Sequence, residues 1–170
     1  MENVIWNYAV PLDGAVDVTG YVAFYWDRVD AWFEENEEVF VHARDPYKRV
    51  DCLSSSRKVS VVVNGETIAE TDSSVMLFET GMPRRFYIPK SDVRAGALRP
   101  SEKITRCPYK GEAHYYSIEV GGELAEDLAW SYRYPIAESG KIAGHLCFPQ
   151  GKVDLFVDGV LEPKPQTRWD

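Results

Sequence analysis

The chain contains 170 residues, of which 45% are hydrophobic, 27% charged and 13% aromatic, and its formal net charge at neutral pH is −8. This length has room for one ordinary domain and an appended segment, and the hydrophobic content excludes a largely disordered chain. The acidic balance argues against a nucleic-acid partner, because phosphate binding requires a cationic surface and no run of this sequence supplies one.

The amino terminus, Met1 to Val4, has no basic region followed by an apolar run. No later segment approaches the roughly 18 apolar residues of a membrane span. The three cysteines are an odd number without close spacing, which favours a reducing compartment over a disulfide framework. We therefore expect a cytoplasmic protein with no membrane partner.

The first internal feature of the chain is a repeat. Residues 5–35 align without a gap on residues 129–159, at a constant offset of 124. About two identities are expected by chance over such a window, so the larger number found indicates a duplication. The identical pairs are Trp6 with Trp130, Tyr8 with Tyr132, Pro11 with Pro135, Gly20 with Gly144, Phe24 with Phe148, Val29 with Val153 and Asp30 with Asp154.

The repeat predicts how the chain is divided. Residues 57–170 are expected to hold a complete unit and a short carboxyl-terminal tail, while residues 1–56 hold the last part of another unit (5–35) and a linker ending near Ser56. A partial unit cannot bury its own apolar face, so we expect that face to pack on the complete unit or in a homodimer. Its large side chains are Trp6, Tyr21, Phe24, Trp26, Trp32 and Phe33.

The remaining elements are predicted to be short strands. Asn64-Gly65 lies between two β-branched runs, residues 58–63 and 66–70, and predicts a hairpin because a type I′ turn needs positive φ at both central positions. A helical turn is expected at residues 91–94, after Pro89. Other strands are expected at residues 39–41, 75–79, 85–88 and 113–120, with a partner starting at 123 and a closing hairpin of 142–148 and 152–157. Because no segment shows sustained helical spacing, the fold is predicted to be an all-β sandwich, barrel or tent.

One stretch concentrates residue types that carry chemistry. Thr105-Arg106-Cys107-Pro108-Tyr109-Lys110-Gly111 brings a thiol, two cations and a phenol together with a Pro and a Gly. Neighbouring cations lower the pKa of a thiol and raise its thiolate fraction, which makes Cys107 a candidate nucleophile. The alternative is a small buried side chain where a strand meets a turn, because free cysteines are often buried.

Several runs of the sequence resemble one known family. They are VTGYVAFYWDRVDAWFEE, HARDPYKRVD, LFETGMPRRFYIPKSDV, TRCPYKGEAHYYSI, AWSYRYP and IAGHLCF. Together they are similar to the family called domain of unknown function 427, over almost the whole chain. The resemblance implies a small, tent-like, all-β fold of the kind grouped with Mss4-like proteins, with one complete unit behind the tail of a first. It implies no established activity.

The residues do not support two chemistries that the resemblance raises. The family is sometimes labelled nucleotidyltransferase-like, but the chain has neither clustered carboxylates to hold Mg²⁺ against phosphates nor a G-x-x-x-x-G-K-[ST] loop. Mss4-like relatives that bind zinc use cysteine pairs, whereas Cys52, Cys107 and Cys147 form no C-x-x-C pair. We therefore predict no metal site and no cofactor.

Residues outside the Cys107–Gly111 run complete the candidate site. Lys110 would bind an anion and Arg84 and Arg85 would complete the clamp. The alternative is that these cations form surface ion pairs with Glu79 and Asp92. If a reaction is catalysed, Glu79 or His114 is the expected base, the alternative for His114 being a surface side chain. The predicted ligand-binding residues are Arg85, Tyr87, Tyr109, Lys110, Tyr116 and Trp130, with Trp130 acting as an aromatic wall or as core packing.

Two functions follow from this reading. The first is binding, and possible transformation, of a small anionic molecule in a cleft built around Cys107-Pro108-Tyr109-Lys110-Gly111. The second is a non-enzymatic interaction or self-association module that uses the apolar surface of the partial repeat, residues 5–35.

Overall fold

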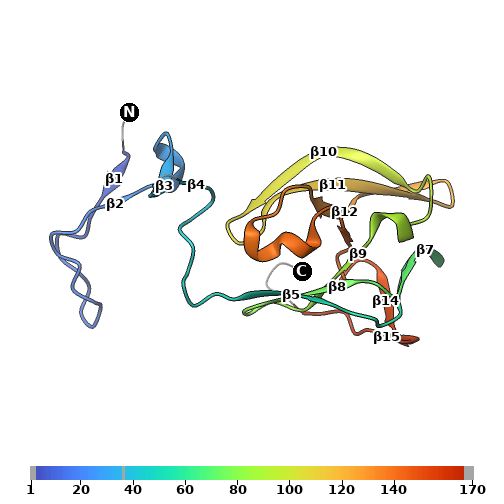
Figure 1. The fold of residues 1–170 in the computed structure, drawn as a ribbon. Coiled ribbons are helices and arrows are strands. Elements are labelled where there is room, and N and C mark those ends of the chain that lie inside the picture. Colours follow the sequence, from blue (N-terminus) through green and yellow to red (C-terminus); the bar gives the residue numbers. More distant parts are fainter. Residues whose placement is uncertain (1–2, 36, 167–170) are drawn as a thin grey trace. The chain divides into compact units, whose positions relative to one another are not determined.

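The computed structural model of the chain describes residues 3–35 and 37–166. The chain divides into two units, Met1–Ala43 (unit 1) and Arg44–Asp170 (unit 2), and Figure 1 labels the strands of both. The sequence predicts a boundary near Ser56, whereas Val50–Ser54 already forms β5 in the main sheet of unit 2. Residues 44–56 are therefore part of unit 2 in the structure.

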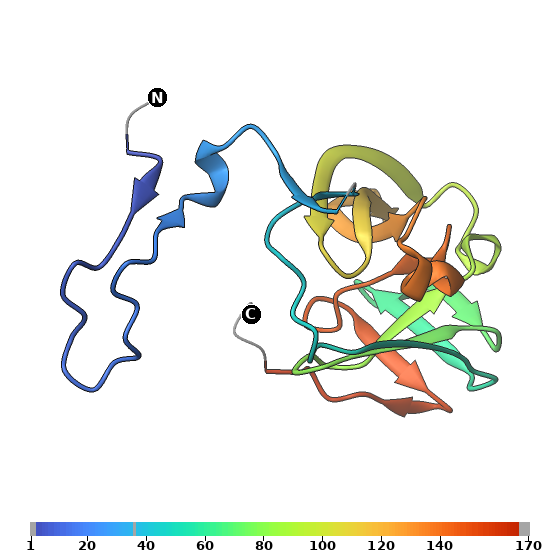
Figure 2. The same ribbon diagram turned by 60° about the vertical axis from the view of Figure 1, so that its left-hand side comes forward.

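Unit 1 consists of two small antiparallel ribbons without a core. β1 (Ile5–Trp6) pairs with β2 (Ala23–Phe24), and β3 (Trp32–Glu34) pairs with β4 (Glu37–Val39) after the 3₁₀ turn η1 (Trp26–Arg28). The rings of Trp26 and Trp32 stack with centroids 4.6 Å apart. None of the side chains described in unit 1 is buried. Figure 2 shows the long loop that connects β1 to β2.

Unit 2 is built from two antiparallel sheets, which confirms the predicted all-β class. The larger has the order β10-β11-β12-β13-β9-β8-β5 and the smaller β15-β14-β6-β7. Among the described residues of unit 2, helical structure is confined to the 3₁₀ turns η2 (Lys90–Asp92) and η3 (Ala137–Ile142). The strands are β5 (Val50–Ser54), β6 (Val59–Val63), β7 (Glu66–Thr71), β8 (Val75–Glu79), β9 (Arg85–Ile88), β10 (Leu98–Cys107), β11 (Gly111–Val120), β12 (Glu123–Tyr132), β13 (Leu146–Cys147), β14 (Asp154–Val157) and β15 (Val160–Leu161).

The larger sheet is buried on two chemically different faces. One face packs on the smaller sheet through an apolar core that includes Ile88, Ile118 and Leu146 from the larger sheet, with Val61 and Leu155 from the smaller one. The other face, which we call the η3 face, carries a second buried cluster with a more polar character. Its members are Cys52, Val75, Leu77, Tyr87, Ala113, Tyr132 and Cys147 from the sheet, and Ile142 from η3.

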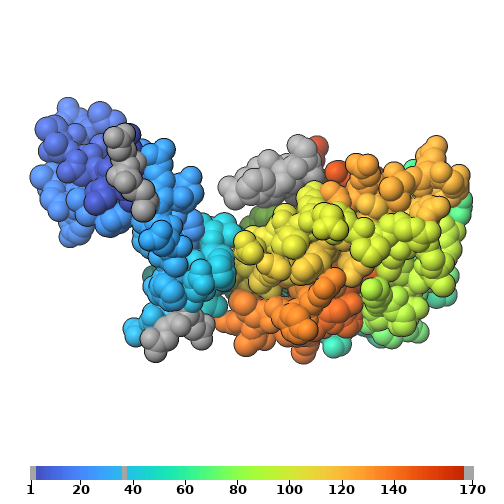
Figure 3. Space-filling model, turned by 90° about the horizontal axis from the view of Figure 1, so that it is seen from above, coloured from blue at the N-terminus to red at the C-terminus, as the bar shows by residue number. Residues whose placement is uncertain are grey.

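Two turn predictions are confirmed, whereas the strand expected at residues 39–41 is wrong, because β4 ends at Val39 and Val41 has φ of 75°. Asn64 and Gly65 have φ of 50° and 79° and connect β6 to β7, and the helical turn after Pro89 is η2. The strand β10 was not predicted, because most of its side chains are exposed and show no alternation; its residues form part of the surface seen in Figure 3.

The closing hairpin predicted for residues 142–148 and 152–157 is wrong. A turn is present, with the Lys152 amide donating to the Pro149 carbonyl at 2.9 Å. However, the chain crosses there from one sheet to the other: β13 pairs with β9 and β12, while β14 pairs with β6 and β15. The turn signal fixes a reversal of local direction but not the strand that pairs next.

The Cys107–Gly111 run forms the turn between β10 and β11. Cys107 and Gly111 are register partners, and the Lys110 amide donates to the Cys107 carbonyl at 3.2 Å. Gly111 has φ of 100°, and a Cβ there would lie 3.2 Å from the Tyr134 carbonyl oxygen. Position 111 therefore requires glycine for two reasons: its φ is positive, and residues 134–136 leave little space for a Cβ atom.

Replacing Gly111 tests this constraint. We expect Gly111→Ala to lower the free energy of unfolding by about 1–3 kcal/mol, because a side chain at positive φ is strained and here also meets backbone. Gly122→Ala is the matched control, since Gly122 has φ of 80° but open space around it, and its loss should be smaller. Urea denaturation measures both; equal losses would show that the approach of residues 134–136 is unimportant.

Candidate functional site

Strand register places most of the candidate side chains on the η3 face. Residues opposite each other on paired strands share a face, and so do residues two apart on one strand. Val75 pairs with Tyr87, Tyr87 with Cys147, and Cys147 with Trp130. By the same alternation Glu79 and Arg85 belong to this face, and Cys107 joins it through its pairing with Gly111.

A cluster of charged groups lies at the end of β8. The Nζ of Lys110 is 2.5 Å from Glu79 Oε2, and the Nζ of Lys48 is 3.6 Å from Glu79 Oε1. The side chains of Lys110 and Glu79 are only 12% and 10% exposed. One nearly buried carboxylate therefore lies between two ammonium groups.

Tyr109 connects this cluster to the segment that precedes β5. Its hydroxyl accepts a hydrogen bond from the Asp45 amide at 2.7 Å, and the Nζ of Lys48 lies 5.2 Å from the centre of its ring. The Tyr109 carbonyl accepts a hydrogen bond from Ser139 Oγ in η3 at 3.1 Å. These contacts fix the Pro108–Gly111 turn against residues 45–48 and against η3. The position of Lys110, which lies in this turn, is fixed with it.

Arg85 lies beside an aromatic pair on the same face. Its guanidinium carbon is 5.9 Å from the centre of the Trp130 ring, and its Nη1 donates to Gln150 Oε1 at 3.4 Å. Trp130 Nε1 in turn donates to the Tyr87 hydroxyl at 3.3 Å. Within the described residues no carboxylate pairs with Arg85, whereas the neighbouring Arg84 pairs with Glu162. Arg85 is thus a half-buried cation without a counter-charge from those residues.

Burial raises the pKa values of two thiols and two phenols on this face. It raises the pKa of Cys147 to about 12, against the opposing effect of the charges on Arg85 and Lys110. It also raises the pKa of Tyr87 well above its ordinary value, and those of Tyr132 and Cys52 in the same direction.

Two of the predicted residues are not brought to this face. His114 and Tyr116 share a side of β11, as their spacing predicts, but it is the opposite side of the sheet from Ala113. Tyr116 packs in the core between the sheets, and His114 Nε2 lies 3.1 Å from Glu112 Oε1. Neither side chain can act together with Glu79 or Arg85.

Sequence reasoning missed two residues that the structure adds. Lys48 completes the ion cluster, and Gln150 is a buried partner of Arg85. A signal for Lys48 was available, because Pro46-Tyr47-Lys48 repeats the order of Pro108-Tyr109-Lys110. The burial of Gln150 had no such signal.

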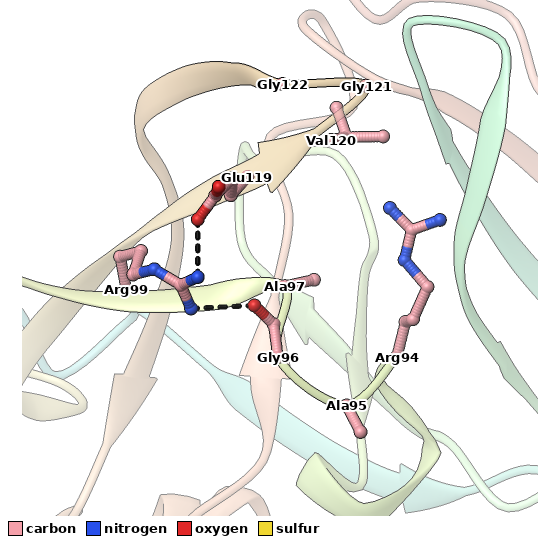
Figure 4. A pocket seen from close by; sticks show the side chains of 9 residues that line it. All are labelled: Arg94, Ala95, Gly96, Ala97, Arg99, Glu119, Val120, Gly121 and Gly122. Carbon is pink, nitrogen blue, oxygen red and sulfur yellow. Dashed lines mark hydrogen bonds and ion pairs between the residues drawn. The ribbon is translucent and has the colours of Figure 1, made fainter.

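A separate pocket of about 270 Å³ lies near the turn between β11 and β12. Figure 4 shows Arg94 and Arg99 at its sides, with Arg99 bound to Glu119 and to the Gly96 carbonyl. Arg94 is paired with Glu66 at 2.6 Å. Because both guanidinium groups are exposed and already paired with carboxylates, this pocket is a poorer anion site than the surroundings of Arg85.

In residues 3–35 and 37–166, no three His, Cys, Asp or Glu side chains are grouped so that they could hold a metal ion. None of the helices in these ranges combines the length and apolar character needed to cross a membrane.

The buried thiol gives a pH-dependent prediction. An unfolded thiol loses its proton near pH 9.0 and Cys147 near pH 12, so between these values the unfolded state binds fewer protons and stability falls as the pH rises. One such group contributes a slope of about 1.4 kcal/mol per pH unit. Cys147→Ala, which introduces the residue found at matching position 23, should make the fall less steep by about that amount. Urea denaturation from pH 9 upward measures it, and an unchanged slope would contradict the burial of this thiol.

The comparisons with known proteins place the chain in a family without assigning a function. No curated protein matches the chain. The family model described as domain of unknown function (DUF427) matches residues 1–35 and 51–159. The matched ranges include Glu79, Arg85, Lys110 and Trp130 but not Lys48. Since they cover most of the chain, the protein belongs to the DUF427 family.

Proposed function

We propose that unit 2 binds a small anionic molecule on the η3 face, with Arg85 as the principal contact. The observation that carries the proposal is the half-buried Arg85 guanidinium, which lies over Trp130 with no carboxylate partner among the described residues. Removing a cation from water without an opposite charge costs free energy. An anionic ligand would supply the missing charge.

The charges around Arg85 favour an anion over a cation. Lys48, Lys110 and Arg85 contribute three positive charges to the η3 face and Glu79 one negative charge, which leaves two positive charges uncompensated. The chain as a whole has a net charge of −8, so this is a local reversal of sign that would attract an anion. A planar guanidinium also matches the geometry of a carboxylate or phosphate.

The neutral groups beside Arg85 are suited to hydrogen bonding with such a ligand. Trp130 donates to the Tyr87 hydroxyl oxygen, so the hydroxyl hydrogen of Tyr87 remains available to an acceptor. The raised pKa of Tyr87 keeps that hydrogen in place at neutral pH. Tyr87 would then donate to the anion that Arg85 holds.

Binding is better supported than catalysis. Cys107 is a free, half-buried thiol on the η3 face and remains our candidate nucleophile. Of the two proposed bases, however, Glu79 is engaged by two lysines and His114 lies on the opposite side of β11. Lys110 and Tyr109 are held by protein contacts, so we assign them to shaping the site rather than to the reaction.

A second candidate function, an interaction module, is favoured by unit 1. Its strands leave large apolar side chains exposed, and none of its described side chains is buried. Exposed apolar surface of this kind marks an interaction site more often than a free surface.

Neighbouring arginines provide a matched test of anion binding. We expect thermal shift against inorganic phosphate, sugar phosphates, nucleotides and small carboxylates to find a stabilising compound, since a ligand at 100 times its Kd adds about 2.7 kcal/mol. Arg85→Gln should abolish this stabilisation, whereas Arg84→Gln should retain it because Arg84 is paired with Glu162. The proposal fails if no compound stabilises the protein or if both variants respond alike.

The ion cluster gives an independent test. Glu79→Gln leaves two lysines without a nearly buried counter-charge, so we expect the free energy of unfolding to fall by about 3–5 kcal/mol. Added inorganic phosphate should restore part of this loss. Glu138→Gln is the control, since the Glu138–Arg44 pair is exposed and should contribute less than about 1 kcal/mol. Equal losses of unfolding free energy in the two variants would show that the Glu79 ion pairs contribute no more than an exposed pair.

A further inference from the structure

Unit 1 shares part of the backbone path of the last part of unit 2, although residues 13–18 lack the 3₁₀ turn of η3 and the β3–β4 pairing differs in register from β14–β15. In the aligned register, Trp6 pairs with Ala23 as Trp130 pairs with Cys147. Gly20 and the matching Gly144 have φ of 83° and 71°. Three hydrogen bonds from a backbone amide to a carbonyl three residues earlier are also shared. In unit 1 they run from Ala15 to Leu12, from Tyr21 to Val18 and from Arg28 to Tyr25. The matching bonds in unit 2 run from Ser139 to Ile136, from His145 to Ile142 and from Lys152 to Pro149.

The two segments differ in what covers them. Val22 is 58% exposed, whereas the matching Leu146 is 0% exposed in the core between the sheets of unit 2. Phe24 is exposed where the matching Phe148 is buried. Apolar residues at matching positions are therefore buried in unit 2 and exposed in unit 1.

The strands that cover the segment in unit 2 are known. On one side β13 pairs with β9, through Leu146 with Ile88, and on the other side β12 pairs with β11, through Trp130 with Tyr115. In unit 1, β1 and β2 pair only with each other among the described residues. Their outer edges present unpaired backbone groups, which are templates for strand addition.

We propose that unit 1 is a docking surface for a polypeptide segment outside residues 1–170 that resembles residues 57–128 of this chain. That segment carries the strands equivalent to β9 and β11, which add to the two open edges, and those equivalent to β6 and β7, which cover Val22 and Phe24. The inference rests on the second candidate function, an interaction role for unit 1, and names its partner.

A second copy of the chain fits this surface less well. Its own residues 57–128 are already paired with its own β12, β13 and β14. To serve unit 1 of another copy, it would have to open these pairings and expose a buried core. A segment whose β9 and β11 equivalents are free needs no such opening.

The test uses residues 57–128 of this chain as the probe, added to the full chain. The probe contains no tryptophan, so a fluorescence shift to shorter wavelength reports burial of tryptophans of the full chain, three of which (Trp6, Trp26 and Trp32) lie in unit 1. We expect a one-to-one complex by light scattering, together with slower hydrogen exchange at residues 5–6 and 22–24. No complex and no protection would overturn the proposal.

A matched pair of variants identifies the surface. Val22→Asp places a charge where the matching Leu146 is buried, so binding of the probe should weaken at least about 100-fold. Val10→Asp is the control, because Val10 is 84% exposed and the matching Tyr134 stays 91% exposed in unit 2; it should leave binding unchanged. Equal weakening by both substitutions would overturn the proposed register.

A second experiment avoids the need for a soluble separate probe by fusing the probe to the chain. Residues 57–128 are placed directly before residue 5, so that Leu128 runs into Ile5 as it runs into Ala129 in unit 2. We expect residues 5–6 and 22–24 to be protected in this chain and Val22→Asp to remove the protection. If they stay unprotected, the proposal is wrong. If the unmodified chain forms a dimer that Val22→Asp disrupts, the interaction role stands but the partner named here is wrong; a monomer that ignores the probe contradicts both.

Discussion

The alternation of side chains along two central strands of unit 2 is the constraint on which its other features depend. In Phe86-Tyr87-Ile88 and Leu146-Cys147-Phe148, the outer residues enter the apolar core and the middle residue enters the cluster on the η3 face. Tyr87 and Cys147 are register partners. A shift of one residue would exchange the two faces, so a single register fixes both the core and the candidate site.

The two cations of the η3 face illustrate different solutions to burial. Lys110 is neutralised by Glu79 at 2.5 Å and held by the turn that Gly111 permits. Among the described residues, the partners of Arg85 are the Trp130 ring and the amide oxygen of Gln150. A cation–π contact and a neutral hydrogen bond offset less of the lost hydration than a carboxylate does. This difference between the two cations is the basis on which we propose Arg85, and not Lys110, as the principal contact for an anion.

The sequence predicted features encoded locally and missed those that depend on the fold. Asn64-Gly65 specifies its turn by backbone preference alone, so the hairpin was predictable. β10 was missed because a sheet-edge strand with exposed side chains has no alternating pattern. The grouping of Glu79 with Lys110 could be suggested from residue types, but the approach of Lys48 and of Gln150 depends on how distant segments meet. For the same reason, the spacing of His114 and Tyr116 predicted that they share one face of β11. Which of the two faces that is depends on the position of the second sheet.

Unit 1 shows which features of its segment are encoded locally and which depend on the rest of the fold. Its turns and its Trp6–Ala23 pairing match those of residues 129–159, although the apolar residues of that segment are buried in unit 2 and exposed in unit 1. Glycine and turn-forming residues at the matched positions thus carry the backbone path, while burial depends on strands that lie elsewhere in the chain. A two-stranded ribbon is marginal without a covering layer, and the aromatic stack of Trp26 on Trp32 buries neither ring fully. The conformation of unit 1 is therefore the half of a fold that local sequence can specify, and its stability depends on the layer that covers Val22 and Phe24.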